Sequence, residues 1–281
     1  VKMANAAVNE CDVLFLVGAR VGDRAVKTPL ALEKTTKIIH IDIDPAEIGK
    51  NIGADLPLVG DAKLVLQQMT ELAKPMKHDE WIAHIKTLGG ERKYVEPAKG
   101  TVNPRVFIDR LAKKMPANVT VVADVGQNQI WTCTEYKFRK EGRLLTSGGM
   151  GTMGYSVPAA IGAKMADSSR ATVAICGDGA FQMSFMELAT AVQFGVDIKV
   201  VVMTNNRLGM VRELQTNGYH DRQTAVFLDG SPDFIKLAEA YGIPAMRVYD
   251  DDTMEKGVEM LAEHEGICLV EVVVDKDMPT L

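Results

Sequence analysis

The chain has 281 residues, which is enough for two domains of ordinary size. Its 25% charged and 47% hydrophobic residues describe a globular protein, and the net charge of −5 gives no reason to expect a nucleic-acid partner. No apolar run is long enough for a membrane span, and no signal peptide opens the sequence. Because the sequence begins at Val1, inside an amphipathic run, we expect a piece of a longer chain.

The first part of the chain alternates between strand and helix patterns. We predict strands over 13–17, 37–43 and 56–59 and a helix over 61–73. Alternation of this kind implies a parallel sheet with helices on both faces. Residues 75–103 are polar and rich in Pro and Gly, so we interpret them as a linker between two domains.

A second α/β domain is predicted from Pro104 onward. The predicted elements are helices over 106–114, 232–241 and 253–264 and strands over 119–123, 171–176, 198–203, 245–248 and 268–274. A further helix is expected from about Ala180 to Gly195, with Phe181, Phe185, Leu188 and Val192 as its apolar set. The fold class is therefore α/β, with two parallel-sheet, three-layer domains.

The stretch from 171 to 210 is the most informative part of the sequence. A right-handed crossover between its two strands makes them parallel, so Asp178 and Asn205 follow strands whose carboxyl ends share one edge. A carboxylate and an amide oxygen are ligands that suit Mg²⁺, which completes its shell with phosphate and water. The N–H groups of the helix starting near Ala180 would add an anion site. This pattern predicts a metal and a diphosphate.

A different class of site competes for the glycine-rich stretch. Gly149, Gly151 and Gly154 form a literal GxGxxG, with Asp178 in the position of a ribose-binding acid, as in a nicotinamide dinucleotide site. The strand before the motif, 144–146, is short, and Asp178 lies in its own Gly-Asp-Gly turn. Both features make the dinucleotide reading the weaker one.

The spaced motifs resemble those of a known family. GDG followed by an asparagine pair resembles the thiamine-diphosphate signature, and SGGMGTMGYSVPAAIGA and GMVRELQ resemble the large catalytic subunit of acetolactate (acetohydroxyacid) synthase. The similarity covers essentially the whole chain. It implies that 1–74 is the second half of a central, FAD-associated domain, hence an incomplete one, and that 104–281 is the diphosphate-binding domain.

The resemblance also assigns residues to the cofactor. Met153 would support the V-shaped cofactor from beneath, Gly151 would contact its aminopyrimidine, and Asp178, Asn205 and the Arg207 carbonyl would bind Mg²⁺. The other cofactor-binding residues would be Gly126, Gln127, Asn128, Gly179, Ala180, Gly209 and Met210. Asn128 stands where the family has His and Thr204 where it has Asn. Leu214 stands where many members carry Trp, which leaves the preference for pyruvate or 2-oxobutyrate as acceptor open.

FAD is implied for the first domain in the same way. The stretches VGARVGDR and IIHIDIDPAEIGKN are similar to flavin-binding segments of the family, although Val21 and Gly22 depart from its usual Phe-Asp-Asp-Arg. From the residues alone these positions read as ordinary turns. The residues that the resemblance assigns to FAD are Gly18, Arg20, Asp23, Asp42, Ile43, Asp61 and Ala62.

The implied activity is decarboxylation of pyruvate and its carboligation to a second 2-oxo acid, toward branched-chain amino acids. Pyruvate oxidase, glyoxylate carboligase and sulfoacetaldehyde acetyltransferase are siblings that share the motifs, and an inert cofactor-binding fragment is a further alternative. The family's catalytic glutamate lies on an N-terminal domain that no stretch here resembles, and Glu187 and Glu213 offer no substitute. We therefore expect no catalytic residue on this chain beyond the supporting Met153.

The resemblance implies a homodimer or tetramer and a possible small regulatory subunit. The four cysteines (Cys11, Cys133, Cys176 and Cys268) are scattered without a CxxC pair, so we expect reduced thiols and a cytoplasmic protein.

Overall fold

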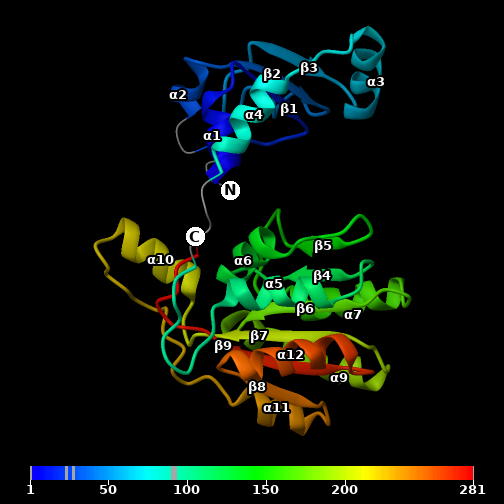
Figure 1. The fold of residues 1–281 in the computed structure, drawn as a ribbon, viewed down its shortest axis with the longest axis vertical. Coiled ribbons are helices and arrows are strands. Elements are labelled where there is room, and N and C mark those ends of the chain that lie inside the picture. Colours follow the sequence, from blue (N-terminus) through cyan, green and yellow to red (C-terminus); the bar gives the residue numbers. More distant parts are fainter. Residues whose placement is uncertain (1, 23–24, 27–28, 90–93, 281) are drawn as a thin grey trace. The chain divides into compact units, whose positions relative to one another are not determined.

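The computed structural model describes residues 2–22, 25–26, 29–89 and 94–280. The chain divides into two compact units, Val1–Arg92 and Lys93–Leu281, which are described separately (Figure 1). Helix α4 (Asp79–Thr87) lies in the stretch predicted as a linker and belongs to the first unit, where His84 Nε2 lies 2.6 Å from Glu10 Oε2 of helix α1 (Lys2–Glu10). The domain boundaries at 74 and 104 stay a prediction.

The first unit contains a three-stranded parallel sheet in the order β1-β2-β3. Its elements are β1 (Val13–Val17), α2 (Pro29–Glu33), β2 (Lys37–Asp42), β3 (Leu56–Val59) and α3 (Ala62–Leu72), besides α1 and α4. Its core is small and centres on Leu32, Ile38 and Ile52. Helix α3 begins where predicted, because Asp61 Oδ1 accepts a hydrogen bond from Leu64 N as an N-cap.

The second unit is built on a six-stranded, fully parallel sheet in the order β5-β4-β6-β7-β9-β8 (Figure 1). The strands are β4 (Thr120–Ala123), β5 (Arg143–Thr146), β6 (Thr172–Gly177), β7 (Lys199–Thr204), β8 (Ala245–Val248) and β9 (Cys268–Val273). The helices are α5 (Pro104–Lys114), α6 (Gln127–Glu135), α7 (Ser156–Ala166), α8 (Asp178–Gln182), α9 (Leu188–Gln193), α10 (Gly209–Gly218), α11 (Phe234–Ala240) and α12 (Asp251–Glu263).

Two apolar layers cover the faces of this sheet. Val173 and Ile175 of β6 pack in the layer formed with α5, α6 and α12. Ala174 and Cys176 of the same strand point the other way, into the layer formed with α7, α9 and α11. Each unit has a parallel sheet with flanking helices, so the predicted α/β class is confirmed.

The single helix predicted after the Gly-Asp-Gly turn is wrong. The segment contains α8, a 3₁₀ turn (Phe185–Glu187) and α9. Ser184, with φ −144°, interrupts the helical rotation, so Leu188 is fully buried whereas Val192 is 44% exposed. Since α8 has only five residues, the anion site expected at the start of a long helix has no support either.

Candidate functional site

Strand order places three loops around one cavity. Strands β4, β6 and β7 are consecutive neighbours in the sheet, so the loops at their carboxyl ends meet at the same edge. The cavity there is lined by residues 125–128, 131, 153, 177–180, 203, 205 and 207–211. Every residue predicted to bind the thiamine cofactor is in this set except Gly151, which is exposed on the loop before α7.

Asp178 is a buried carboxylate, 2% exposed, at the end of β6. Its Oδ1 accepts from Gly179 N at 2.8 Å, and its Oδ2 accepts from Asn205 N at 3.0 Å and Asn206 N at 2.6 Å. Burial raises the pKa of Asp178 to about 6, against the lowering effect of these backbone donors. A carboxylate has about four lone-pair sites, so the three N–H donors leave room for a metal ion.

Asn205 follows the neighbouring strand, as predicted. Gly177 pairs with Met203 in the parallel register of β6 and β7, which brings the two loop starts together. Asn205 Oδ1 accepts from Arg207 N at 3.0 Å, and its Nδ2 donates to Gln127 Oε1 at 3.3 Å. One carboxylate and one amide oxygen suit a hard ion that keeps water and phosphate ligands. The described residues contain no cluster of three or more His, Cys, Asp or Glu side chains that could hold a metal ion by themselves.

The loops that line the cavity pack closely against one another. A Cβ at Gly209 would collide with Gln127 Oε1, so a larger residue here would require the buried Gln127 side chain to move. Asn128 is 3% exposed, and its Nδ2 donates to the carbonyl oxygens of Asp124 (2.9 Å) and Ile175 (3.2 Å). Both hydrogens of its side-chain amide are therefore used inside the protein, so the side chain has no N–H left for a diphosphate.

Met153 reaches the cavity from the glycine-rich loop. Its side chain is half-buried and packs against the apolar layer of α7 and α8. Its Cε lies 3.4 Å from where a Cβ on Gly179 would stand, so the thioether faces the turn that carries Asp178. The predicted support role of Met153 stays a prediction.

The C-terminal segment contacts this site, which the sequence did not predict. Gln127 Nε2 donates to Met278 O at 3.0 Å and to Thr280 Oγ1 at 3.2 Å. Glu213 Oε1 accepts from Thr280 N at 3.1 Å, and its Oε2 accepts from Gln127 Nε2 at 3.3 Å. Glu213 thus contacts Gln127, which lines the cavity, whereas Glu187 accepts from Thr190 Oγ1 in its own segment. No local pattern signals these contacts, since they join residues far apart in the chain.

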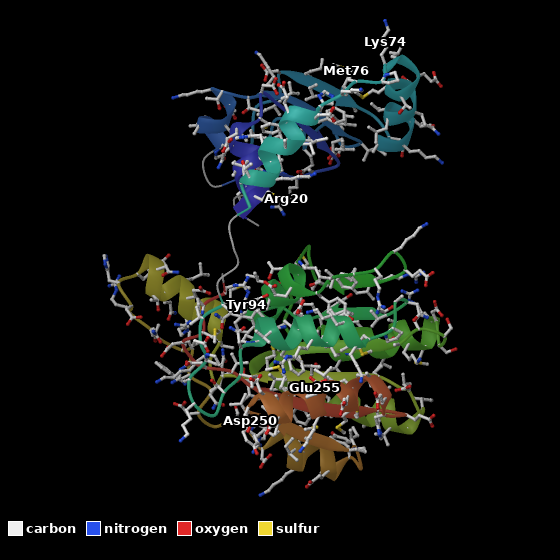
Figure 2. All side chains as sticks on the ribbon, in the orientation of Figure 1. Arg20, Lys74, Met76, Tyr94, Asp250 and Glu255 are labelled. Carbon is white, nitrogen blue, oxygen red and sulfur yellow. The ribbon has the colours of Figure 1, made fainter. Side chains whose placement is uncertain are left out.

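The residues predicted to hold FAD lie at the carboxyl ends of β1, β2 and β3, apart from Asp23, which lies outside the described residues. Asp42 Oδ1 accepts from Asp44 N at 2.9 Å and Asp61 caps α3, so both carboxylates also serve their own turns. Arg20 is exposed on the loop after β1 (Figure 2), and Ile43 is 70% exposed. Gly18 directly follows β1, and Ala62 is the first residue of α3.

Comparison with known proteins identifies the family. The family model described as "Thiamine pyrophosphate enzyme, C-terminal TPP binding domain" matches residues 124–272, more than half of the chain. The chain belongs to the thiamine pyrophosphate enzyme family. The model of the central domain of thiamine pyrophosphate enzymes matches residues 1–69 as well. The second unit is thus the part of a thiamine pyrophosphate enzyme that binds thiamine diphosphate, and the dinucleotide alternative is wrong.

Several curated proteins similar to this chain are named acetolactate synthases. The chain is 40% identical over 98% of its length to a probable acetolactate synthase large subunit of Methanocaldococcus jannaschii. It is 36% identical over 97% to the acetolactate synthase large subunit of Lactococcus lactis, and 35% identical over 98% to that of isozyme 2 of Escherichia coli. These matches cover 48%, 48% and 50% of the relatives, so the chain spans about half their length. The predicted resemblance to acetolactate synthases is confirmed.

Among the described residues, no helix combines the length and the apolar character that a membrane span needs.

Proposed function

We propose that the protein carrying this chain decarboxylates pyruvate and joins the remaining two-carbon unit to a second 2-oxo acid, with thiamine diphosphate and Mg²⁺. The products would be 2-acetolactate or 2-aceto-2-hydroxybutyrate, which lead to branched-chain amino acids. The observation that carries the proposal is the buried Asp178 carboxylate beside Asn205 at the edge of a cavity, in a thiamine-diphosphate-binding domain. The names of the relatives support the choice of reaction.

In this proposal the residues of the chain bind and orient the cofactor. Asp178, Asn205 and the carbonyl of Arg207 would hold Mg²⁺, and Met153 would support the cofactor from the glycine-rich loop. Thiamine diphosphate, when bound, supplies a carbon nucleophile for the carbonyl of a 2-oxo acid and makes the loss of CO₂ possible. Gln127 and Gly209 would keep the two cavity loops in contact, since they pack directly against each other.

The proton donor and acceptor for the reaction would come from outside these 281 residues. A general acid–base group must lie within hydrogen-bond reach of the proton that it moves. Glu213 contacts the cavity residue Gln127, but both of its oxygens bond to Thr280. We therefore propose that residues 1–281 alone bind Mg²⁺ and the diphosphate but form no product, and that the N-terminal domain of the family restores activity in cis or in trans.

The proposal also covers FAD, the assembly of the enzyme and its compartment. The first unit would associate with FAD through the ends of β1, β2 and β3. Dimers or tetramers would complete the enzyme, and a small subunit would regulate it, as the name "large subunit" of the relatives suggests. The four free thiols support a reducing compartment, the cytoplasm.

A product assay tests the reaction. The full-length protein would be given Mg²⁺, thiamine diphosphate and FAD, with pyruvate alone or with added 2-oxobutyrate, and the products identified by mass spectrometry. We expect acetolactate from pyruvate and acetohydroxybutyrate when 2-oxobutyrate is present. Consumption of pyruvate only with oxygen and phosphate, or turnover of glyoxylate or sulfoacetaldehyde instead, would assign the protein to one of the sibling activities.

A further inference from the structure

A second buried carboxylate lies next to the candidate site, at the end of β4. Asp124 has 0% exposure and does not line the cavity. Its Oδ1 accepts from Val125 N at 2.8 Å and from Gly154 N at 3.0 Å, and its Oδ2 accepts from Ser156 N at 2.7 Å. Three backbone donors from two segments therefore converge on one side chain.

Asp124 repeats the arrangement of Asp178 one strand away. Each aspartate follows a strand and accepts from the next amide in the chain, Val125 or Gly179. Each also accepts two amides from the segment that follows a neighbouring strand, β5 for Asp124 and β7 for Asp178. Asp178 thereby fixes the loop that carries Asn205, its partner in the proposed metal site. The same arrangement at Asp124 suggests that this residue also fixes a loop with a function at the site.

The loop that Asp124 holds is residues 147–155. Gly151 and Gly154 have φ of +65° and +83°, and Met150 is 90% exposed, so neither regular structure nor burial holds most of it. In the described part of the chain its other hydrogen bonds stay within the loop and its flanking elements, such as Gly151 N to Ser147 O at 2.9 Å. The side chain that it sends to the cavity is Met153.

We infer that Asp124 is a positioning residue, which fixes loop 147–155 and with it Met153 against the edge that carries Asp178. The inference rests on the proposed function insofar as Met153 serves the thiamine cofactor. The chemistry requires a carboxylate, because two acceptor oxygens serve three donors and a charged acceptor forms stronger hydrogen bonds to N–H groups. In Asp124→Asn an N–H₂ group would face the Ser156 amide, or one oxygen would have to serve all three donors.

Hydrogen–deuterium exchange resolved to single amides tests the anchoring in the full-length protein. In the wild type the amides of Gly154 and Ser156 should exchange at least tenfold more slowly than the amide of Met150. Asp124→Asn should accelerate both by roughly tenfold, the effect expected for losing a charged hydrogen bond. The matched control is Asp167→Asn at the other end of α7, which should change neither. Equal rates for Gly154, Ser156 and Met150 in the wild type would overturn the inference even if the Asp124 variant did not fold.

A double-mutant cycle between Asp124→Asn and Met153→Ala tests the link to the cofactor. If Asp124 acts through Met153, the loss of kcat caused by Asp124→Asn should shrink at least threefold in the Met153→Ala background. If the fold losses of kcat in the two single variants simply multiplied in the double variant, Asp124 would serve the fold alone, and the inference would be overturned. If Met153→Ala by itself left kcat unchanged, the proposed role of Met153 would fail, and amide exchange would still decide whether Asp124 anchors the loop.

Discussion

The backbone nitrogen of Asn205 lies 3.0 Å from Oδ2 of Asp178, so the loop after β7 is bonded directly to the turn after β6. The same oxygen accepts from Asn206 N at 2.6 Å. Asp178 therefore has two tasks in our account: it orders the loop that carries Asn205, and it faces the same metal ion as that residue. Removing its side chain would leave buried N–H donors unpaired, at about 1–3 kcal/mol each.

The first prediction concerns the charge of Asp178. Asp178→Asn keeps the size of the side chain but removes the negative charge that attracts Mg²⁺, so affinity for thiamine diphosphate with Mg²⁺ should fall on the order of 100-fold. Calorimetry with and without EDTA measures this, and Asp252→Asn on the exposed start of α12 is the control. Unchanged affinity in Asp178→Asn would remove this residue from the metal site.

The second prediction concerns Met153. Met153→Ala should lower kcat by about tenfold or more, because the cofactor loses the support that we propose for the Met153 side chain. The apparent affinity for the diphosphate should change less than about threefold, since Asp178 and Asn205 remain. Met165→Ala on α7, where the side chain is 61% exposed, should leave both quantities unchanged. A loss of affinity at constant kcat would make Met153 an ordinary packing residue.

The third prediction concerns the contact between Gly209 and Gln127. In Gly209→Ala the new methyl group would collide with Gln127 Oε1 and would lie 3.0 Å from Asn205 Nδ2. The buried Gln127 side chain must then leave its present position, so we expect at least a tenfold loss of cofactor affinity and a lower melting temperature. Gly218→Ala in the same helix meets nothing within 4 Å and should be neutral or stabilising. If Gly209→Ala and Gly218→Ala had the same cofactor affinity and melting temperature, the packing of Gly209 against Gln127 would not matter for the site.

The fourth prediction concerns Glu213. Glu213→Ala removes the acceptors for Thr280 N and Thr280 Oγ1, so residues 275–280 should exchange amide hydrogens faster and the free energy of unfolding should fall by about 1–2 kcal/mol. Glu255→Ala on α12 (Figure 2) provides an exposed control. Full protection of the C-terminal segment in Glu213→Ala would show that other contacts hold it.

Much of the fold could be predicted because local patterns determine it. The strands 13–17, 56–59 and 245–248 agree with the structure to the residue, since each is a short, mainly apolar run between turn residues. The residues around Asp178 and Asn205 could be predicted too, because parallel strands bring their carboxyl ends together. The broken helix after Asp178 could not, since Phe181, Phe185, Leu188 and Val192 keep a helical spacing through the break at Ser184.

The features that escaped prediction depend on contacts between distant residues. Asp124 accepts from the backbone of Gly154, 30 residues away, and Thr280 N donates to the Glu213 carboxylate, 67 residues away. Nothing in the neighbouring sequence indicates those partners. Val226 lies in the polar stretch 216–232, yet it is fully buried and its carbonyl accepts from Leu208 N at 2.9 Å. A polar composition therefore did not show that part of this stretch packs against the cavity loops.

A crystal structure of the full-length protein with Mn²⁺ and thiamine diphosphate tests the central claim most directly. The account predicts an anomalous scattering peak at about 2.1–2.3 Å from one carboxylate oxygen of Asp178 and from Oδ1 of Asn205, with the diphosphate completing the shell. In Asp178→Asn crystals this peak should be absent. A metal peak elsewhere, with the diphosphate bound away from the ends of β6 and β7, would contradict the account.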